Sequence, residues 1–213
     1  MNDTPGYHET RLSFDARREV LWKTLCEACF QRLVPPAACV LELGAGYGHF
    51  INHIRCNRRI AVDKWPGFLR YVDSDVIAHV GEAADLSFIS DSSVDFVFAS
   101  NLVEHLTQGE FATVLDALQK KLKPGGTLNL LQPNYRFAYR EYFDDYTHVT
   151  VYSDRSLVDY LESHGLRVID CRPRFLPLTV KSWLPVWPFL IRLYLRLPYK
   201  PLAKQMLVRA VFE

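Results

Sequence analysis

Short apolar runs alternate with amphipathic segments along the chain, and this alternation predicts a mixed α/β fold. Seven runs have the length and composition of buried strands; they cover 39–43, 59–62, 76–80, 94–99, 127–131, 166–169 and 205–212. Because strands that alternate with helices form a mostly parallel sheet, we expect such a sheet with helices on both of its faces.

Apolar residues at spacings of three and four predict the helices. Segments with this pattern, or with helical character after a turn, are 15–33, 50–54, 110–122 and 153–163. The third segment stops at the Lys-Pro-Gly-Gly sequence of 123–126, which is typical of a helix end followed by a turn. Ser153 is a suitable N-cap for the fourth segment, and Gly165 suits its C-terminal end.

A helical insertion is predicted between the sixth and seventh strands, at about 175–203. Pro188 suits the first turn of a helix and Pro198 ends it, while Arg192 and Arg196 share one face. The segment 183–197 has three open interpretations: a helix at a membrane surface, a lid over the substrate, or an oligomer contact. It is too short and too interrupted to cross a bilayer.

Composition is that of an ordinary globular protein. The chain has 213 residues, of which 49% are hydrophobic and 23% charged, and these values suit one domain spanning 1–213. The polar segment 1–18 does not resemble a secretory signal peptide, and the five cysteines are scattered. We therefore expect a cytoplasmic protein, and we read the Cys26/Cys29 pair as core packing rather than redox or metal chemistry.

Positive charge is concentrated in the C-terminal quarter. The segment 167–212 contains nine Lys or Arg and one acidic residue, whereas the whole chain has a net charge of +1. This asymmetry indicates an anionic partner, either lipid headgroups or a phosphate-bearing substrate, or else a solvated basic face. Nothing in the pattern favours nucleic acid.

A glycine-rich turn follows the first strand, and an acidic residue ends the second. The turn reads GAGYG over 44–48, and the acid is Asp63. Glycines let the backbone bend sharply and let a ligand approach closely, and a carboxylate at the next strand end can accept hydrogen bonds from a ribose. The G-x-G-x-G spacing differs from the G-x-G-x-x-G of dinucleotide sites, which disfavours NAD(P).

Four motifs in this order resemble those of the class I S-adenosylmethionine (SAM)-dependent methyltransferases, in particular the group similar to ubiquinone-pathway O-methyltransferases. The matching segments are VLELGAGYGHF, IAVDK, VGEAADLSFISDSSVDFVFASNLVEHL and LKPGGTLNLLQPN, within residues 38–170. The resemblance implies a Rossmann-like seven-stranded sheet whose last strand is antiparallel. It also implies SAM as the cofactor.

The resemblance assigns roles to individual residues. Glu42 and the turn Gly44, Ala45 and Gly46 would face the methionine part of SAM. Asp63 would hold the ribose, and Lys64 or Trp65 would lie beside the adenine. Further contacts would come from Glu82 and Ala83, or Asp85, at the adenine edge and from Asn101 at the methyl donor.

Two histidines are placed to act on a methyl acceptor. His105 follows Glu104 after the fourth strand, and His148 lies between the fifth strand and the next helix. Because an alcohol or phenol must lose its proton, a histidine base would help. Some relatives bind a divalent ion through an E-x-x-E-H segment and a distant histidine; here Asn101 replaces the first glutamate, which disfavours a metal and leaves its use open.

The sequence therefore predicts a methyltransferase that acts on a small-molecule or lipid-linked acceptor, with oxygen as the favoured acceptor atom. Two alternatives remain at this point: an NAD(P)-binding oxidoreductase, and a SAM-binding protein without turnover. The acceptor itself, the oligomeric state and the use of a metal are not determined by the sequence.

Overall fold

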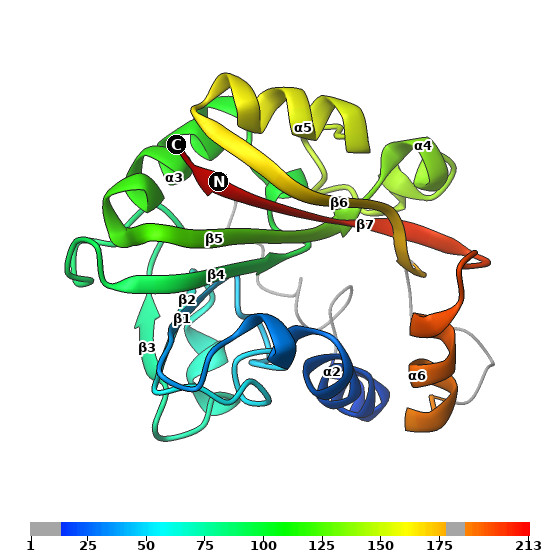
Figure 1. The fold of residues 1–213 in the computed structure, drawn as a ribbon, viewed down its shortest axis with the longest axis horizontal. Helices are drawn as coiled ribbons and strands as arrows, with labels where there is room; N and C mark the ends of the chain where they lie inside the picture. Colours follow the sequence, from blue (N-terminus) through cyan, green and yellow to red (C-terminus); the bar gives the residue numbers. More distant parts are fainter. Residues whose placement is uncertain (1–13, 178–185) are drawn as a thin grey trace.

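One seven-stranded sheet organises the computed structural model, which describes residues 14–177 and 186–213 (Figure 1). The strand order is β3-β2-β1-β4-β5-β7-β6. The strands are β1 Cys39–Leu43, β2 Arg58–Asp63, β3 Ile77–Val80, β4 Val94–Ser100, β5 Leu122–Pro133, β6 Leu166–Pro177 and β7 Ala203–Phe212. Strands β1 to β5 pair in parallel, and β7 is antiparallel to both β5 and β6. The predicted Rossmann-like sheet with an antiparallel last strand is confirmed.

Helices cover both faces of this sheet. The α-helices are α2 Ala16–Ala28, α3 Gln108–Lys121, α4 Tyr135–Ala138, α5 Asp154–Ser163 and α6 Pro188–Arg196, and the 3-10 helices are η1 Phe30–Leu33, η2 Pro66–Arg70, η3 Val103–His105 and η4 Tyr142–Asp144. Helices α3 and α5 lie on one face, and α2, with α6 beside it, lies on the other (Figure 1). The predicted cap of α5 is confirmed, because the Ser153 hydroxyl accepts a hydrogen bond from the Ser156 N–H.

The core has two layers because alternate residues of each buried strand point to opposite faces. Leu41 of β1 and Val97 of β4 pack in the layer under α3 and α5. Val40 and Phe98 pack in the layer under α2, where the Phe98 ring stacks on Phe50 with 4.0 Å between centroids. This packing fixes the ends of β1 and β4 relative to each other.

The helix predicted over 50–54 is wrong: the chain forms hydrogen-bonded turns there. Within these turns the Ile51 N–H donates to the Glu42 carboxylate at 3.0 Å, so its acceptor is a side chain of β1 and not a backbone carbonyl. The turn predicted at 123–126 also differs. These residues are the bulged start of β5, where the register against β4 shifts between Val94 and Phe96.

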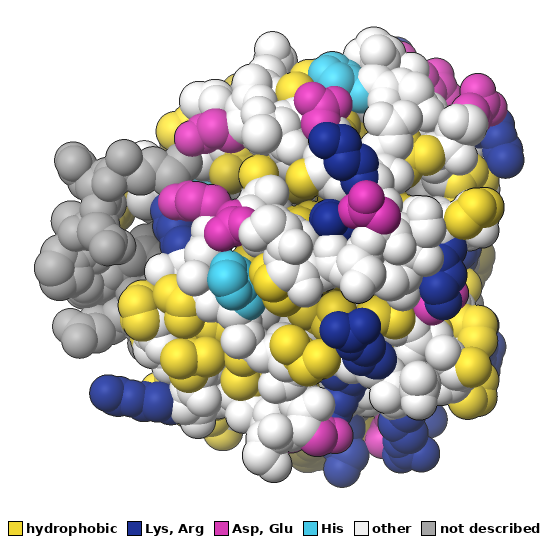
Figure 2. Space-filling view, turned by 90° about the vertical axis from the view of Figure 1, so that its left-hand side faces the viewer, with side chains coloured by type: hydrophobic (Ala, Val, Ile, Leu, Met, Phe, Trp, Pro, Cys, Tyr) yellow, Lys and Arg dark blue, Asp and Glu magenta, His cyan; other side chains and the backbone are white. Residues whose placement is uncertain are grey.

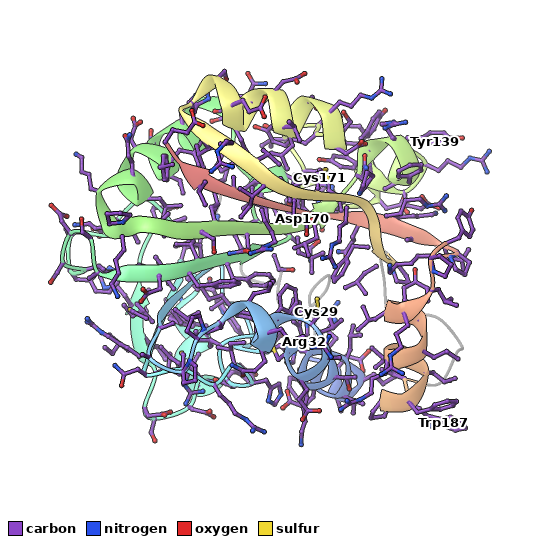
Figure 3. The ribbon with its side chains drawn as sticks, viewed as in Figure 1. Cys29, Arg32, Tyr139, Asp170, Cys171 and Trp187 are labelled. Atoms are coloured by element: carbon purple, nitrogen blue, oxygen red, sulfur yellow. The ribbon has the colours of Figure 1, made fainter. Side chains whose placement is uncertain are left out.

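The cysteines fit the predicted structural role. Cys26 is fully buried in the layer under α2, and burial raises the pKa of its thiol. Cys29 lies at the end of α2 and Cys171 on β6 (Figure 3), and all five cysteines are free thiols. A free, buried thiol with a raised pKa is unreactive, as expected for core packing.

The insertion forms α6, which begins at Pro188 as predicted. Its inner side chains pack against α2, and Arg192 pairs with Glu27 at 2.6 Å. Its outer side chains are exposed, with Trp187 at 60% and Phe189 at 65%. Of the segment 183–197, residues 183–185 lie outside the described residues. Of the helices that the structure describes, none is long and apolar enough to cross a bilayer.

Candidate functional site

The glycine turn after β1 is fastened to the end of β2. Gly44 and Gly46 have φ values of 67° and 53°, which favour glycine. The N–H groups of Gly44 and Ala45 both donate to the Val62 carbonyl, at 2.9 and 3.2 Å. A side chain at Gly44 would lie 3.1 Å from Leu102, so this turn abuts the loop that follows β4. Two of the predicted segments therefore meet here.

Asp63 is the acceptor at the centre of this arrangement. One carboxylate oxygen accepts from the Gly46 N–H at 2.7 Å, and the other accepts from the Trp65 N–H at 2.8 Å. The residue is only 8% exposed. Each carboxylate oxygen has two lone pairs, so one on each oxygen is left for a ligand. Lys64, next in the chain, is exposed.

Glu42 lies beneath the turn and is buried. Its carboxylate accepts the Ile51 N–H at 3.0 Å, and burial raises the pKa of this carboxyl group well above its usual value. The carboxyl group thereby holds the 44–51 turn against β1. The turn is thus bound by carboxylates from two strands, by Glu42 of β1 at Ile51 and by Asp63 of β2 at Gly46.

The segment after β3 joins the same edge. The Gly81 N–H donates to the backbone carbonyl of Asp63 at 3.0 Å, which places Glu82 and Ala83 beside the end of β2. Glu82 is exposed and Ala83 half-buried. Asp85, the alternative to this pair, is exposed and lies 3.5 Å from His79.

Asn101, directly after β4, forms hydrogen bonds with both β5 and β7. It has a φ of 50°, its N–H donates to the Leu131 carbonyl at 2.8 Å, and its side-chain oxygen accepts from Gln205 at 2.8 Å. A positive φ in a residue other than glycine is a strained conformation that frequently marks a functional site. The sequence did not indicate Gln205 as a site residue, because β7 follows β4 by about a hundred residues and only the sheet order brings it there.

Glu104, His105 and His148 form one cluster, although 43 residues separate the two histidines. One ligand atom from each lies within 4.8 Å of the others. The two imidazole rings have centroids 4.8 Å apart, and the His105 Nδ1 lies 2.9 Å from the Thr147 hydroxyl oxygen. The N–H groups of Val149 and Thr150 donate to the Glu104 carbonyl, and these bonds hold the loop that carries His148 against η3.

Burial sets the protonation of this cluster. Glu104 is 1% exposed, its two carboxylate oxygens accept no hydrogen bond among the described residues, and burial raises its pKa to about 8. Burial, followed by the charge of His148, lowers the pKa of His105 to about 4. A histidine with this pKa is neutral near pH 7, and a neutral imidazole is the form that can accept a proton or bind a metal.

Comparison with known proteins bears directly on this site. A family model described as a methyltransferase domain matches residues 14–170. The chain belongs to this methyltransferase family. SAM is accordingly its cofactor, which favours the SAM interpretation over the NAD(P) one.

Individual relatives of this methyltransferase agree. Malonyl-[acyl-carrier protein] O-methyltransferase of Methylococcus capsulatus is 29% identical over 165 residues, which are 70% of this chain and 59% of that protein. The chain therefore spans about three fifths of that relative's length. A SAM-dependent methyltransferase from Archaeoglobus fulgidus has the same fold, with a TM-score of 0.69, 20% identity and 96% of each chain covered.

A third neighbour shares the fold and carries ligands. It is geranyl diphosphate C-methyltransferase from Streptomyces coelicolor, in complex with Mg²⁺, geranyl diphosphate and S-adenosylhomocysteine (SAH). The TM-score is 0.59 at 15% identity, and the match covers 88% of this chain and 78% of that one. At these identities the two solved structures bear on the fold alone.

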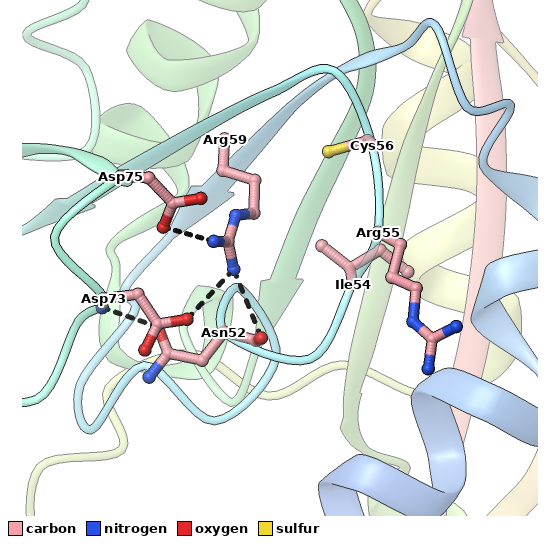
Figure 4. A pocket seen from close by; sticks show the side chains of 7 residues that line it. All are labelled: Asn52, Ile54, Arg55, Cys56, Arg59, Asp73 and Asp75. Atoms are coloured by element: carbon pink, nitrogen blue, oxygen red, sulfur yellow. Dashed lines mark hydrogen bonds and ion pairs between the residues drawn. The ribbon is translucent and has the colours of Figure 1, made fainter.

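Two other groups of polar side chains are not part of the Glu104, His105 and His148 cluster. His49 and His53 both contact the Glu19 carboxylate, at 3.2 and 2.7 Å, so these two histidines pack against α2. A pocket at the start of β2 is lined by Arg59, whose guanidinium is already paired with Asp73 and Asp75 (Figure 4). With these donors engaged, the pocket offers no evident chemistry.

Aromatic residues after β5 divide between core and surface. Tyr142 is fully buried, and its ring lies 4.7 Å from that of His148. Tyr139, Phe143 and Tyr146 are more than half exposed. Of these four rings, only that of Tyr142 is buried beside the histidine cluster.

Proposed function

We propose that this enzyme transfers the methyl group of SAM to an oxygen of a small-molecule or lipid-linked acceptor. The single observation that carries the proposal is the cluster of Glu104, His105 and His148 beside the Asn101 loop. A relative named as an O-methyltransferase supports oxygen as the acceptor atom. For this chain, the acceptor and its reacting atom are part of the proposal.

In this proposal the cofactor lies across the carboxyl ends of β1, β2 and β4. Asp63 accepts hydrogen bonds from the ribose hydroxyls, and Asn101 lies near the methyl donor. The glycine turn and Glu42 face the methionine part, Lys64 lies beside the adenine, and Glu82 with Ala83 borders its edge. The contacts among the glycine turn, Asp63 and the 101–102 loop support this placement, because they converge at one sheet edge.

The chemistry follows from charge. SAM carries a sulfonium, and its methyl carbon is attacked in line by the acceptor oxygen while the carbon–sulfur bond breaks, giving neutral SAH. The acceptor hydroxyl loses its proton in this step, and we assign the imidazole of His105 or His148 as the group that takes it. The buried side chains of Glu104 and Tyr142 exclude water from this side of the cluster. Exclusion of water favours transfer of the methyl group to an aligned acceptor over its transfer to water.

The direct test is methyl transfer from SAM labelled in its methyl group to matched alcohol, phenol, carboxylic acid, amine and thiol acceptors. We expect label in O-methyl ethers or esters, because the proposed base acts on a hydroxyl or carboxyl proton. Identification of the products by mass spectrometry checks the outcome. Label found only on nitrogen, carbon or sulfur would contradict the proposed acceptor atom.

A divalent cation is a second candidate for the same cluster. The close approach of the three ligand atoms and the orphaned oxygens of Glu104 fit a cation, which Glu104, His105 and His148 would hold. When bound, the ion would polarise an acceptor hydroxyl and lower its pKa. The neutral amide of Asn101 replaces a charged ligand, so the fit is weaker than that of a complete carboxylate set.

Chelation separates the two candidates. We expect enzyme treated with EDTA to keep its turnover within about twofold, because two histidines and one carboxyl group form a weak site for Mg²⁺, which prefers oxygen ligands. The measurement is the initial rate before and after chelation, with Mg²⁺ or Mn²⁺ added back. Loss of turnover that the added ion restores would establish the metal-dependent mechanism instead.

A further inference from the structure

Arg174 of β6 is held between two aromatic rings. Its guanidinium carbon lies 4.8 Å from the centroid of Phe137, on α4, and 4.9 Å from that of Tyr199, which follows α6. One terminal nitrogen donates to the Tyr199 hydroxyl at 3.1 Å. The two ring contacts and this hydrogen bond restrict the position of the guanidinium, whose remaining N–H groups are donors that an oxygen could accept.

Arg174 has no acidic partner among the described residues. Several other basic residues in this part of the molecule do have one, in the pairs Arg136–Asp154, Arg172–Asp170, Arg192–Glu27 and Lys204–Glu141, whereas Lys200 donates to the Leu197 carbonyl. Moreover, the Nε of Arg174 is buried and has no hydrogen-bond acceptor within the described part of the chain. A buried donor without an acceptor is unfavourable, and an oxygen supplied by a ligand would remove that cost.

The position of Arg174 links it to the proposed active site. Strand β6 runs parallel to β5, so its C-terminal end lies at the same edge as the ends of β4 and β5. The Asn134 side chain, directly after β5, donates to the Pro173 carbonyl at 3.0 Å and also caps α4, which carries Phe137. The sheet order β4-β5-β7-β6 places three strand spacings, or roughly 14 Å, between the backbones at Asn101 and Arg174.

The surroundings suit a ligand that arrives from outside. Helix α4 and the chain around α6 lie on the side toward which β4 and β5 point, with Tyr139 and Trp187 at their outer ends (Figures 1 and 3). Tyr199 is itself 64% exposed. On the face at the other end of the molecule, basic and acidic side chains are interspersed (Figure 2).

We propose that Arg174, flanked by Phe137 and Tyr199, binds an oxyanion of the methyl acceptor, that is, a phosphate or a carboxylate group. The planar fork of an arginine matches both groups. The inference rests on the proposed function, and it narrows the acceptor to a molecule that carries an anionic group in addition to its reacting oxygen.

The test compares wild type with Arg174→Gln and with a matched control, Arg196→Gln. Arg196 is an exposed arginine of α6 and lies outside the aromatic clamp. Because the acceptor is unidentified, calorimetric titrations use inorganic phosphate and acetate as soluble probes, and vesicles with phosphatidic acid as the lipid probe. We expect one probe to bind wild type and Arg196→Gln alike, and to bind Arg174→Gln roughly 10- to 100-fold more weakly, with Arg174→Lys intermediate.

Each outcome has a defined meaning. The probe that binds most tightly, whether phosphate, acetate or vesicles, identifies the anion and its source. Any of the three results supports the proposal, provided that only Arg174→Gln weakens the binding of that probe. Equal weakening in Arg196→Gln would indicate a general basic surface and overturn it, as would equal binding by wild type and Arg174→Gln. SAH affinity is measured on the same samples, and we expect it to be unchanged in Arg174→Gln. If wild type did not bind SAH, the result would count against the proposed function and not against the role of Arg174.

Discussion

Replacement of Asp63 by alanine is expected to weaken SAH binding by on the order of 100- to 1000-fold. Both carboxylate oxygens already accept a backbone N–H, at 2.7 and 2.8 Å, and in the proposed complex each would also accept a ribose hydroxyl. Hydrogen bonds to a charged group contribute roughly 1.5–3 kcal/mol each, and about 1.4 kcal/mol corresponds to tenfold in affinity. Calorimetric titration with SAH measures the change.

A matched control separates ligand binding from the stability of the sheet. Asp95 also holds the backbone of β1, because its carboxylate accepts the Cys39 N–H at 2.8 Å, but at the opposite end of that strand. We expect Asp95→Ala to lower the midpoint of urea unfolding and to leave SAH affinity within about threefold of wild type. If Asp63→Ala also bound SAH within threefold of wild type, the ribose role of Asp63 would be wrong.

Alanine at His105 or His148 is expected to lower the rate of methyl transfer by roughly 100- to 10,000-fold, the usual contribution of a general base. The variant that removes the base itself should show the full effect. The other variant should show a smaller one, because the centroids of the two rings lie 4.8 Å apart and the lost ring no longer packs against the base. SAH affinity should be nearly unchanged in both, since neither imidazole is assigned to the cofactor. Initial rates with the acceptor found by the labelling experiment provide the measurement.

His164→Ala is the matched control for these variants. His164 ends α5 and contacts the Tyr160 carbonyl through Nδ1 at 2.8 Å, away from the cluster. Its removal should leave turnover unchanged. Full turnover in both His105→Ala and His148→Ala would contradict the proposed chemistry, and retained SAH binding without any transfer by wild type would identify a binding protein without turnover.

Replacement of Glu104 is expected to change stability and turnover in opposite directions, which a residue with a structural role alone would not do. Its carboxyl group is buried without a hydrogen-bond acceptor or donor among the described residues, so Glu104→Leu should stabilise the fold by about 1–3 kcal/mol while lowering turnover. The pKa of Glu104 is about 8 in the folded state and 4.5 without burial, so the cost of burying it grows as pH rises from 4.5 to 8 and is constant above that. The gain from Glu104→Leu should therefore be larger above pH 8 than at pH 6. Urea unfolding at the two pH values tests this.

Much of the fold was predictable from local pattern. The limits of β1 and the caps of α5 and α6 depend on a few neighbouring residues, such as Ser153 and Pro188, whose conformational preferences act locally. Over 50–54 the chain forms turns instead of the predicted helix, and the Ile51 N–H there donates to Glu42, nine residues earlier in the chain. A local pattern carries no information about such a contact.

For the site, the sequence alone determined the family and the order of its motifs, because the glycine turn and the acid after the next strand are local signals of spacing. It also indicated Glu104, His105 and His148 individually. Only the tertiary structure decided that these three meet within 4.8 Å and that Gln205 bonds to Asn101. It also decided that Arg174 lies between Phe137 and Tyr199 without an acidic partner among the described residues. The physical reason is that the sheet order places β7 between β5 and β6, so residues far apart in the sequence become neighbours at one edge.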